Sequence, residues 1–133
     1  MARLLKAGAA GADEVIDILI VDDSALMREA IAGLLAMAPG CQVVGTGANG
    51  LEGLELARAY HPRLVILDIN MPVMGGMEAL GLLKMELPQI EVVMVSSILD
   101  TELREHALGL GAYACVEKGS ELWERLVTIV SEM

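Results

Sequence analysis

Several short apolar runs of this sequence end in polar residues that could do chemistry together. These residues are Asp22-Asp23, Asp68, Ser96-Ser97 and Glu117-Lys118. Three carboxylates brought close together repel one another and favour a divalent cation with oxygen ligands, such as Mg²⁺. A lysine and a hydroxyl could then pair with the oxygens of a phosphoryl group while a carboxylate attacks the phosphorus. The residue types therefore point to phosphoryl transfer.

The runs that carry these residues are predicted to be strands of a parallel sheet. Residues 16–21, 64–67 and 92–95 are apolar and rich in β-branched side chains, which is typical of strands buried on both faces. Weaker runs at 42–44 and 113–116 complete a set of five. All five are short enough for strands and are separated by longer segments of a different periodicity.

Helical periodicity fills the gaps between the runs. The expected first helix carries an apolar stripe of Leu26, Ala30, Ile31, Leu34 and Leu35 and ends at Pro39-Gly40. The second is capped by Asn49 and carries Leu51, Leu54 and Ala57 before His61-Pro62. The others are expected at about 76–87, 101–110 and from 120 onwards, the last with Trp123, Leu126, Val127 and Val130. Alternation of strand and helix predicts one open α/β sheet with helices on both faces, whose carboxyl edge gathers the polar residues.

Each polar residue also has a purely structural interpretation. A single aspartate after a strand more often caps a helix, and Asp23 or Ser24 could do so. Ser96 alone would be a turn residue, and Lys118 alone a solvated charge. Trp123 is most simply a core or helix-packing residue. The joint placement of acids, hydroxyl and lysine at one sheet edge favours the chemical interpretation.

Composition sets further bounds. The 133 residues suffice for one domain, expected at 16–133 after a flexible lead-in at 1–15. The net charge of −10 argues against direct binding of nucleic acid or of anionic lipid. Cys41 and Cys115 show no metal-type spacing, and the sequence has no membrane-spanning run. We therefore expect a cytoplasmic protein.

Four segments resemble the receiver domains of two-component response regulators. They are ILIVDDSALMR (18–28), LDINMPVMGGM (67–77), VMVSS (93–97) and VEK (116–118). The resemblance covers roughly residues 16–132 in the right order. It implies a flavodoxin-like (βα)5 three-layer sandwich with a parallel five-stranded sheet in the order 2-1-3-4-5.

The resemblance also implies a role for each matching residue. Asp68 matches the carboxylate that accepts a phosphoryl group from a sensor histidine kinase. Asp23 matches a direct Mg²⁺ ligand, Asp22 a ligand acting through water, and the Asn70 backbone carbonyl the completing ligand. Ser96, Ser97 and Lys118 match the groups that meet the phosphoryl oxygens and respond to them. The expected protein is a phosphoacceptor switch rather than an enzyme.

Other positions depart from the family pattern or concern its surface. Cys115 stands where many receivers carry an aromatic ring that turns inward on activation, and Gly119 where a proline often follows the lysine. The expected partner surface comprises Leu103, Arg104, Ala107, Leu108 and Tyr113. Its partner would be a downstream protein, an output domain, or a second copy bound through the fourth helix, fifth strand and fifth helix.

Two other functions are compatible with part of this pattern. A haloacid-dehalogenase-type phosphatase also uses an aspartate and Mg²⁺, and Asp68-Ile69-Asn70 is similar to its Asp-x-Asp motif, but that motif follows the first strand of a larger fold. A receiver-like module that binds partners without phosphorylation is the other alternative. Cys115 favours it, whereas the complete set of acids, hydroxyl and lysine (Asp22, Asp23, Asp68, Ser96 and Lys118) argues against it. Stretches of the chain resemble the receivers of chemotaxis methylesterases, and DNA-binding regulators start similarly. A stand-alone regulator and a receiver of a longer protein are both compatible with the sequence.

Overall fold

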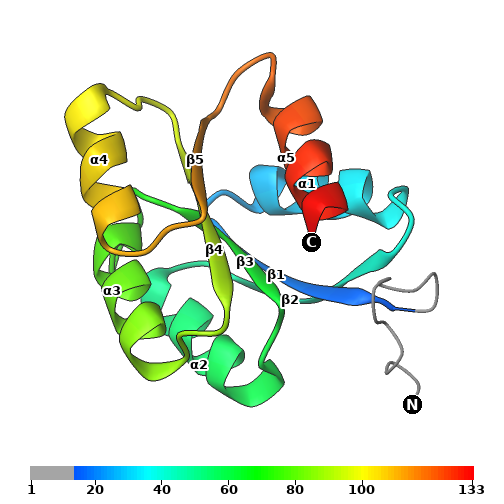
Figure 1. Cartoon of the computed structure of the whole chain (residues 1–133), viewed down its shortest axis with the longest axis horizontal. Helices are drawn as coiled ribbons and strands as arrows, with labels where there is room; N and C mark the ends of the chain where they lie inside the picture. Colours follow the sequence, from blue (N-terminus) through cyan, green and yellow to red (C-terminus); the bar gives the residue numbers. More distant parts are fainter. Residues whose placement is uncertain (1–13) are drawn as a thin grey trace.

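Five strands and five helices alternate along the chain (Figure 1). The computed structural model describes residues 14–133. The strands are β1 (Ile16–Val21), β2 (Cys41–Gly47), β3 (Leu64–Asp68), β4 (Glu91–Ser96) and β5 (Ala114–Glu117). The helices are α1 (Ala25–Ala36), α2 (Gly50–Tyr60), α3 (Gly76–Glu86), α4 (Thr101–Gly109) and α5 (Leu122–Glu132). Every predicted element is present; of the predicted lead-in, residues 1–13 lie outside the described part.

All strand pairs are parallel, and their order is β2-β1-β3-β4-β5. This order confirms the flavodoxin-like fold that the family resemblance implied. Helices α2, α3 and α4 lie on one side of the sheet and α1 and α5 on the other (Figure 1). The order reverses between β1 and β3, so the crevice beyond their carboxyl ends is the topological switch point. Asp22 and Asp68 stand at those two strand ends.

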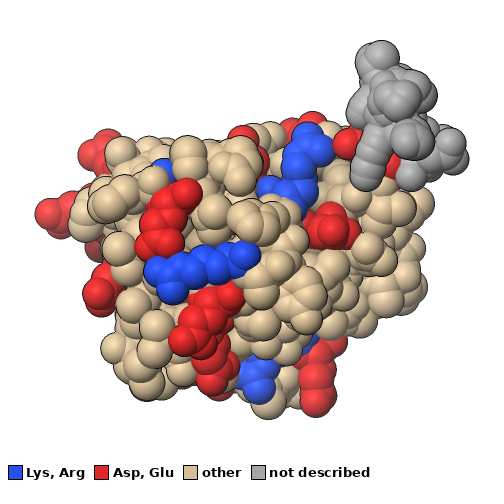
Figure 2. Space-filling model, turned by 90° about the horizontal axis from the view of Figure 1, so that it is seen from below, with Lys and Arg blue, Asp and Glu red and all other residues tan. Residues whose placement is uncertain are grey.

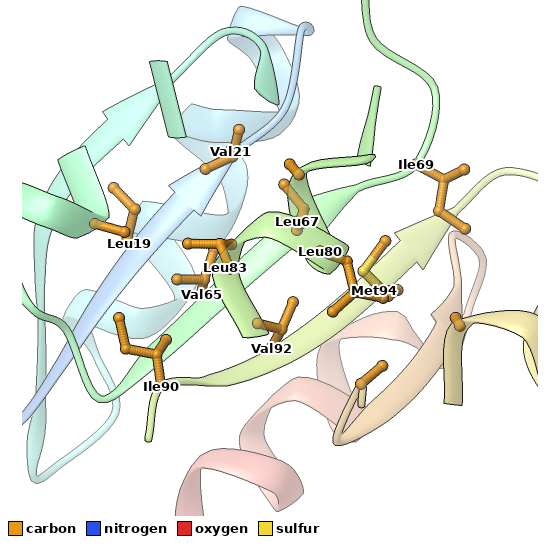
Figure 3. Packing of buried hydrophobic residues seen from close by; sticks show 14 of the residues in the cluster. Leu19, Val21, Val65, Leu67, Ile69, Leu80, Leu83, Ile90, Val92 and Met94 are labelled. Carbon is orange, nitrogen blue, oxygen red and sulfur yellow. The ribbon is translucent and has the colours of Figure 1, made fainter. Parts of the chain in front are cut away.

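The face of the sheet under α3 shows how apolar strands fix this arrangement (Figure 3). Leu19, Val65 and Val92, from three neighbouring strands, point to the same side as Leu80 and Leu83 of α3. All five side chains are at most 1% exposed. Burying each such side chain contributes about 1.5–3 kcal/mol. A second cluster on the opposite face includes Ile18, Ile20, Ile31, Leu35, Ile66, Val95, Leu126 and Val130.

Helix α1 buries a different row of side chains from the predicted stripe. Ile31 and Leu35 are in the core with Met27 packed beside them, and these positions are four residues apart. Leu26 is 77% exposed, and Ala30 is exposed as well. The sequence has two adjacent apolar rows on this helix, and only one of them can face the sheet. The prediction that Leu26 and Ala30 belong to the buried stripe is therefore wrong.

The same effect appears on α5. Leu122, Leu126, Ile129 and Val130 are buried, whereas the neighbouring row of Trp123 and Val127 is exposed. Trp123 is thus outside the core, which leaves the helix-packing alternative of the two interpretations. It lines a shallow apolar groove with Leu34 of α1. No helix within residues 14–133 combines the length and the apolarity needed to cross a membrane.

Side chains cap three of the helices as their residue types suggest. Ser24 accepts a hydrogen bond from the Met27 amide at 3.1 Å and starts α1. Asn49 caps α2, as predicted, by accepting from the Glu52 amide at 2.9 Å. Asp100 does the same for α4. Such caps satisfy amides that have no partner inside the helix and contribute about 1 kcal/mol each.

Charged side chains on the surface are mixed rather than segregated on the face seen from below in Figure 2. Acidic and basic groups lie next to one another there, among uncharged residues. An ion pair also joins α2 to α3, where Arg58 Nε lies 2.9 Å from Glu86 Oε1. This hydrogen bond to the Glu86 carboxylate raises the pKa of Arg58 and lowers that of Glu86. Because both groups are exposed, solvent screens their attraction.

A strained turn lies between β3 and α3. Val73 has φ 68°, and the Met74 amide donates to the Pro72 carbonyl at 2.7 Å, which closes a γ-turn around Val73. A β-branched side chain is unfavourable at positive φ, whereas asparagine tolerates it. The Val73 side chain is 78% exposed, so it has little packing to lose. Val73→Asn should therefore raise the free energy of unfolding by about 1 kcal/mol.

Urea denaturation measures this change. Val73→Ala serves as the control, because it removes the branching but keeps a Cβ at positive φ and should gain less. A lower free energy of unfolding in Val73→Asn than in the parent would contradict the assigned strain.

Candidate functional site

Three carboxylates meet beyond the ends of β1 and β3. The strands are direct neighbours, with Val21 opposite Leu67, so Asp22 and Asp68, the next residue on each side, lie side by side. One carboxylate oxygen from each of Asp22, Asp23 and Asp68 lies within 4.8 Å of the others. Asp22 and Asp68 are buried, and Asp23 is exposed. The structure therefore brings together the three acids that the sequence singled out.

Lys118 reaches this cluster from β5. Its Nζ lies 3.0 Å from Asp22 Oδ2 and 3.5 Å from Asp68 Oδ1, so one ammonium bridges two buried carboxylates. Burial lowers the pKa of Lys118, but the hydrogen bond to Asp22 and the charge of Asp68 together raise it above its usual value. The lysine is therefore held in its charged form beside both acids.

The carboxylate of Asp68 is electrostatically unfavourable in this place. Burial, followed by repulsion from Asp22, raises its pKa from 3.8 to about 6, although Lys118 acts in the opposite direction and Asp23 adds further repulsion. A divalent cation would relieve this repulsion, and every candidate ligand side chain offers a hard carboxylate oxygen. The donor set thus fits Mg²⁺ and not a metal that prefers nitrogen or sulfur.

The helix caps exclude the interpretation of Asp23 and Asp68 as capping residues. Ser24, and not Asp23, caps α1, while α3 begins after Gly75 without a side-chain cap. Asp22 is instead fixed in position by the Ser24 amide, which donates to its Oδ1 at 2.8 Å. The acids consequently point at one another for a reason other than capping.

Ser96 ends β4 at the same edge and is 1% exposed. Its hydroxyl donates to the Ile98 carbonyl at 2.7 Å and accepts from the Ile98 amide at 3.3 Å, so it is bound to the loop that leads into α4. The Lys118 amide donates to the Ser96 carbonyl at 2.8 Å, which fixes the lysine next to the serine. Ser97 and Asn70, also singled out from the sequence, are exposed residues just beyond β4 and β3.

Gly76 is a positioning residue that the sequence reasoning did not identify. A Cβ at this position would lie on the Asp68 carbonyl oxygen and 2.7 Å from Ile69 Cα. The Gly76 amide donates to the Ile69 carbonyl at 2.7 Å. The start of α3 thus packs directly on the backbone that carries Asp68. The pair Gly75-Gly76 was the available signal, because a glycine at a helix start indicates a close backbone approach.

The expected partner surface needs one correction. Leu108 and Tyr113 are exposed, and Leu103 and Arg104 are half-buried, but Ala107 is fully buried. Ala107 packs against the sheet as part of the core under α4, so it cannot contact a partner. Cys115 is also buried, and burial raises the pKa of its thiol, with Arg104 acting in the opposite direction.

Residues 18–131 match the family model described as the response regulator receiver domain. The chain belongs to this family. The receiver is therefore a phosphoacceptor module of two-component signalling, as the sequence predicted. Receiver domains bind Mg²⁺ at an acidic pocket and interact with histidine kinases and with output domains or other proteins.

Curated relatives and solved structures agree with the assignment. A protein-glutamate methylesterase/protein-glutamine glutaminase of Oleidesulfovibrio alaskensis is 44% identical over 106 residues, which are 78% of this chain and 28% of the relative. The transcriptional regulatory protein LnrK of Bacillus subtilis is 38% identical over 98 residues, which are 74% of this chain and 44% of LnrK. The chain spans less than half the length of either relative.

Among solved structures, the response regulator domain of Thermotoga maritima CheB is 33% identical with a TM-score of 0.79, covering 90% of this chain and 92% of that one. The CheX–CheY–BeF3–Mg²⁺ complex of Borrelia burgdorferi matches with a TM-score of 0.81 at 25% identity, covering 88% of each chain. The fold of this receiver is thus shared with receivers of several kinds of regulator.

Proposed function

We propose that Asp68 is the phosphoacceptor of this receiver and that Asp22, Asp23, Ser96 and Lys118 form its site. The observation that carries the proposal is the bridge made by Lys118 between Asp22 and Asp68. It places one fixed positive charge beside the carboxylate whose neighbours otherwise repel it. Such a charge stabilises the negative charge on the phosphoryl oxygens during transfer, because it is already in place before the reaction.

The proposed reaction is a displacement at phosphorus. An oxygen of the Asp68 carboxylate attacks the phosphorus of a kinase phosphohistidine, a new O–P bond forms, and the P–N bond breaks. The electron pair of that bond stays with the imidazole nitrogen. Lys118 pairs with one phosphoryl oxygen, and the Ser96 hydroxyl turns from Ile98 to donate to another. Water later attacks the same phosphorus, the O–P bond to Asp68 breaks, and inorganic phosphate leaves.

Asp23, Asp68 and the backbone carbonyl of Asn70 would hold Mg²⁺, with Asp22 acting through water. When bound, the ion supplies positive charge that offsets repulsion between the carboxylates and the phosphoryl group. Asp23 suits the position of direct ligand because it is the exposed member of the cluster and does not serve as a cap. Asp22 is already engaged by Lys118 and the Ser24 amide.

The output of the switch would pass through α4, β5 and α5. Of the residues predicted for the partner surface, Leu103, Arg104, Leu108 and Tyr113 are exposed or half-exposed. Tyr113 also links β5 to α5, since its hydroxyl donates to Glu132 Oε1 at 2.7 Å. The partner of this surface would be a downstream protein, an output domain or a second copy, and the phosphodonor a sensor histidine kinase. A cytoplasmic location, typical of receivers, is part of the proposal.

Incubation with acetyl phosphate and Mg²⁺, followed by intact-mass measurement, tests the acceptor. The parent protein should gain the mass of one phosphoryl group, and Asp68→Ala should gain none, because that variant lacks the carboxylate to which the proposal assigns the acceptor role. Asp17→Asn is the matched control: Asp17 lies on the same strand as the cluster but near its opposite end, and its uptake should equal that of the parent. Equal uptake by Asp68→Ala would refute the assignment.

The same samples separate this proposal from a phosphatase. A receiver consumes a phosphodonor only as fast as its own aspartyl phosphate forms and hydrolyses, and it should show no multiple turnover of simple phosphomonoesters. Sustained phosphate release from such esters would favour an enzyme. Absence of any phosphoryl addition to the parent would favour a module that binds without phosphorylation.

A further inference from the structure

Arg104 ties helix α4 to strand β5. Its Nη1 donates to the Cys115 carbonyl oxygen at 3.1 Å. Cys115 stands opposite Met94 in the β4–β5 ladder, two positions before Ser96, and it precedes Lys118 by three residues. The guanidinium therefore contacts the backbone of the strand pair that presents both the hydroxyl and the lysine of the proposed site.

The side chain of Cys115 cannot itself carry the signal from that site to the surface. It is 1% exposed and packs in the core cluster under α4. A small buried thiol offers no ring that could swing between an inner and an outer position. A group that moves must therefore come from elsewhere, and Arg104 is the side chain that α4 places on the Cys115 backbone.

Arg104 also has space into which it can move. It lines an open cleft of about 300 Å³ together with Glu117, Lys118, Ser120 and Arg125. The side chain is only half-buried where it stands. Departure from Cys115 into this cleft would leave the guanidinium in contact with water and acidic side chains, so its charge would not be stranded.

The start of α4 connects Arg104 to the site through a short covalent path. Both hydrogen bonds of the Ser96 hydroxyl go to the backbone of Ile98, two residues before the helix cap Asp100. The Arg104 amide in turn donates to the Asp100 carbonyl at 3.0 Å, in the first turn. If the hydroxyl turns to a phosphoryl group on Asp68, Ile98 loses both bonds and the first turn of α4 is no longer anchored.

We propose that Arg104 is the positioning residue that couples Asp68 to the surface of α4 and β5 in this receiver. It holds α4 on the Cys115 carbonyl while Asp68 is unmodified, and it leaves that carbonyl when Ser96 engages a phosphoryl group. This role rests on the proposed function, and it replaces the rotating ring that Cys115 does not provide.

The buried thiol of Cys115 reports this movement. In a Cys41→Ala background it is the single cysteine of the chain, and its rate of reaction with an aromatic disulfide reagent measures how often α4 leaves it accessible. Beryllofluoride with Mg²⁺ serves as the stable phosphoryl mimic. We expect it to raise the reaction rate about fivefold or more, the range of a typical coupling free energy.

Arg104→Met should abolish the effect of beryllofluoride on the Cys115 reaction rate without disrupting the phosphoacceptor site. It keeps the apolar stem but not the donor, so Cys115 should react rapidly with and without beryllofluoride, in a ratio near one. A merely structural role would raise both rates equally and leave the ratio unchanged, which would overturn the proposal. Arg104→Lys keeps a cationic donor and should recover part of the response. Arg125→Met, which lines the same cleft from α5, should respond like the background protein.

Two further measurements separate this proposal from the one on which it rests. Asp68→Asn in the Cys41→Ala background should show no response to beryllofluoride, and a response would mean that the thiol reports something other than Asp68. Arg104→Met should still gain one phosphoryl group from acetyl phosphate. If the parent takes up a phosphoryl group normally but the rate ratio with and without beryllofluoride is the same in Arg104→Met as in the background protein, only the role of Arg104 is overturned. If the parent takes up no phosphoryl group, the proposed function is overturned.

Discussion

Replacing Gly76 by alanine is expected to lower the free energy of unfolding by more than about 3 kcal/mol, a severe loss for a domain of this size. The new Cβ would meet the carbonyl oxygen of Asp68, with the Asp68 carbonyl carbon at 2.9 Å and Ile69 Cα at 2.7 Å. All three atoms belong to the buried backbone at the carboxyl end of β3, so no flexible side chain can yield. The measurement is urea denaturation followed by circular dichroism.

The same helix provides a matched control. A Cβ at Gly81 would meet nothing within 4 Å, so Gly81→Ala adds the same methyl group in open space. This change should raise stability by roughly 0.5–1 kcal/mol, since alanine is the better helix former. A Gly76→Ala protein that is as stable as the parent would show that α3 can move off β3 without cost. Gly76 would then not position Asp68.

Asp68→Asn should stabilise the metal-free protein at neutral pH by up to about 3 kcal/mol. The folded state raises the pKa of Asp68 from 3.8 to about 6, mainly through burial, so the folded state is penalised for holding the charged form. Asparagine is nearly isosteric and carries no charge. Lys118 keeps a partner in the variant, because Asp22 remains 3.0 Å away.

The sign of the pH dependence distinguishes this cause from a simple packing change. A raised acidic pKa means that the unfolded state releases its proton first, so the penalty is complete above about 6 and absent below 3.8. The advantage of Asp68→Asn over the parent should therefore grow as the pH rises between these values and then stay constant. A constant advantage across this range would exclude the electrostatic cause.

Thermal or urea unfolding in a chelating buffer at several pH values measures the difference. Exposed Glu105 supplies the control, since Glu105→Gln removes a negative charge from α4 without relieving the buried cluster and should change stability by less than about 0.5 kcal/mol. Added Mg²⁺ should stabilise the parent and reduce the advantage of Asp68→Asn, because ligand binding to the folded state adds to its stability.

Sequence patterns alone predicted the strands and helices and the edge of the sheet at which the polar residues gather. Strand prediction succeeded because a strand buried on both faces must be apolar at every position, as residues 64–67 are. The place where the polar residues meet could be predicted because parallel strands share one carboxyl edge, so a residue at the end of a strand has a known location. The strand order was not available from periodicity and came from the resemblance to receivers, because crossover helices can join strands in several orders.

Tertiary packing decided which of several apolar rows a helix buries. Leu26 and Trp123 are exposed although their residue types suit a core, while Ala107 is buried although its helix was expected to face partners. Adjacent rows on a helix differ by a small rotation, and only contact with the sheet selects one of them. Val73, in the turn between β3 and α3, likewise adopts a positive φ that its residue type disfavours.

The contacts within the site were also decided by the tertiary structure. The sequence determined that carboxylates, a hydroxyl and an ammonium would share one place, since residue type and strand position suffice for that. It did not determine that Lys118 bridges Asp22 and Asp68, that Ser96 is bound to Ile98, or that Arg104 reaches Cys115. A long side chain can reach several partners that distant segments bring close to it. Which of them it contacts depends on distances of a few ångströms, and only the folded chain defines these distances.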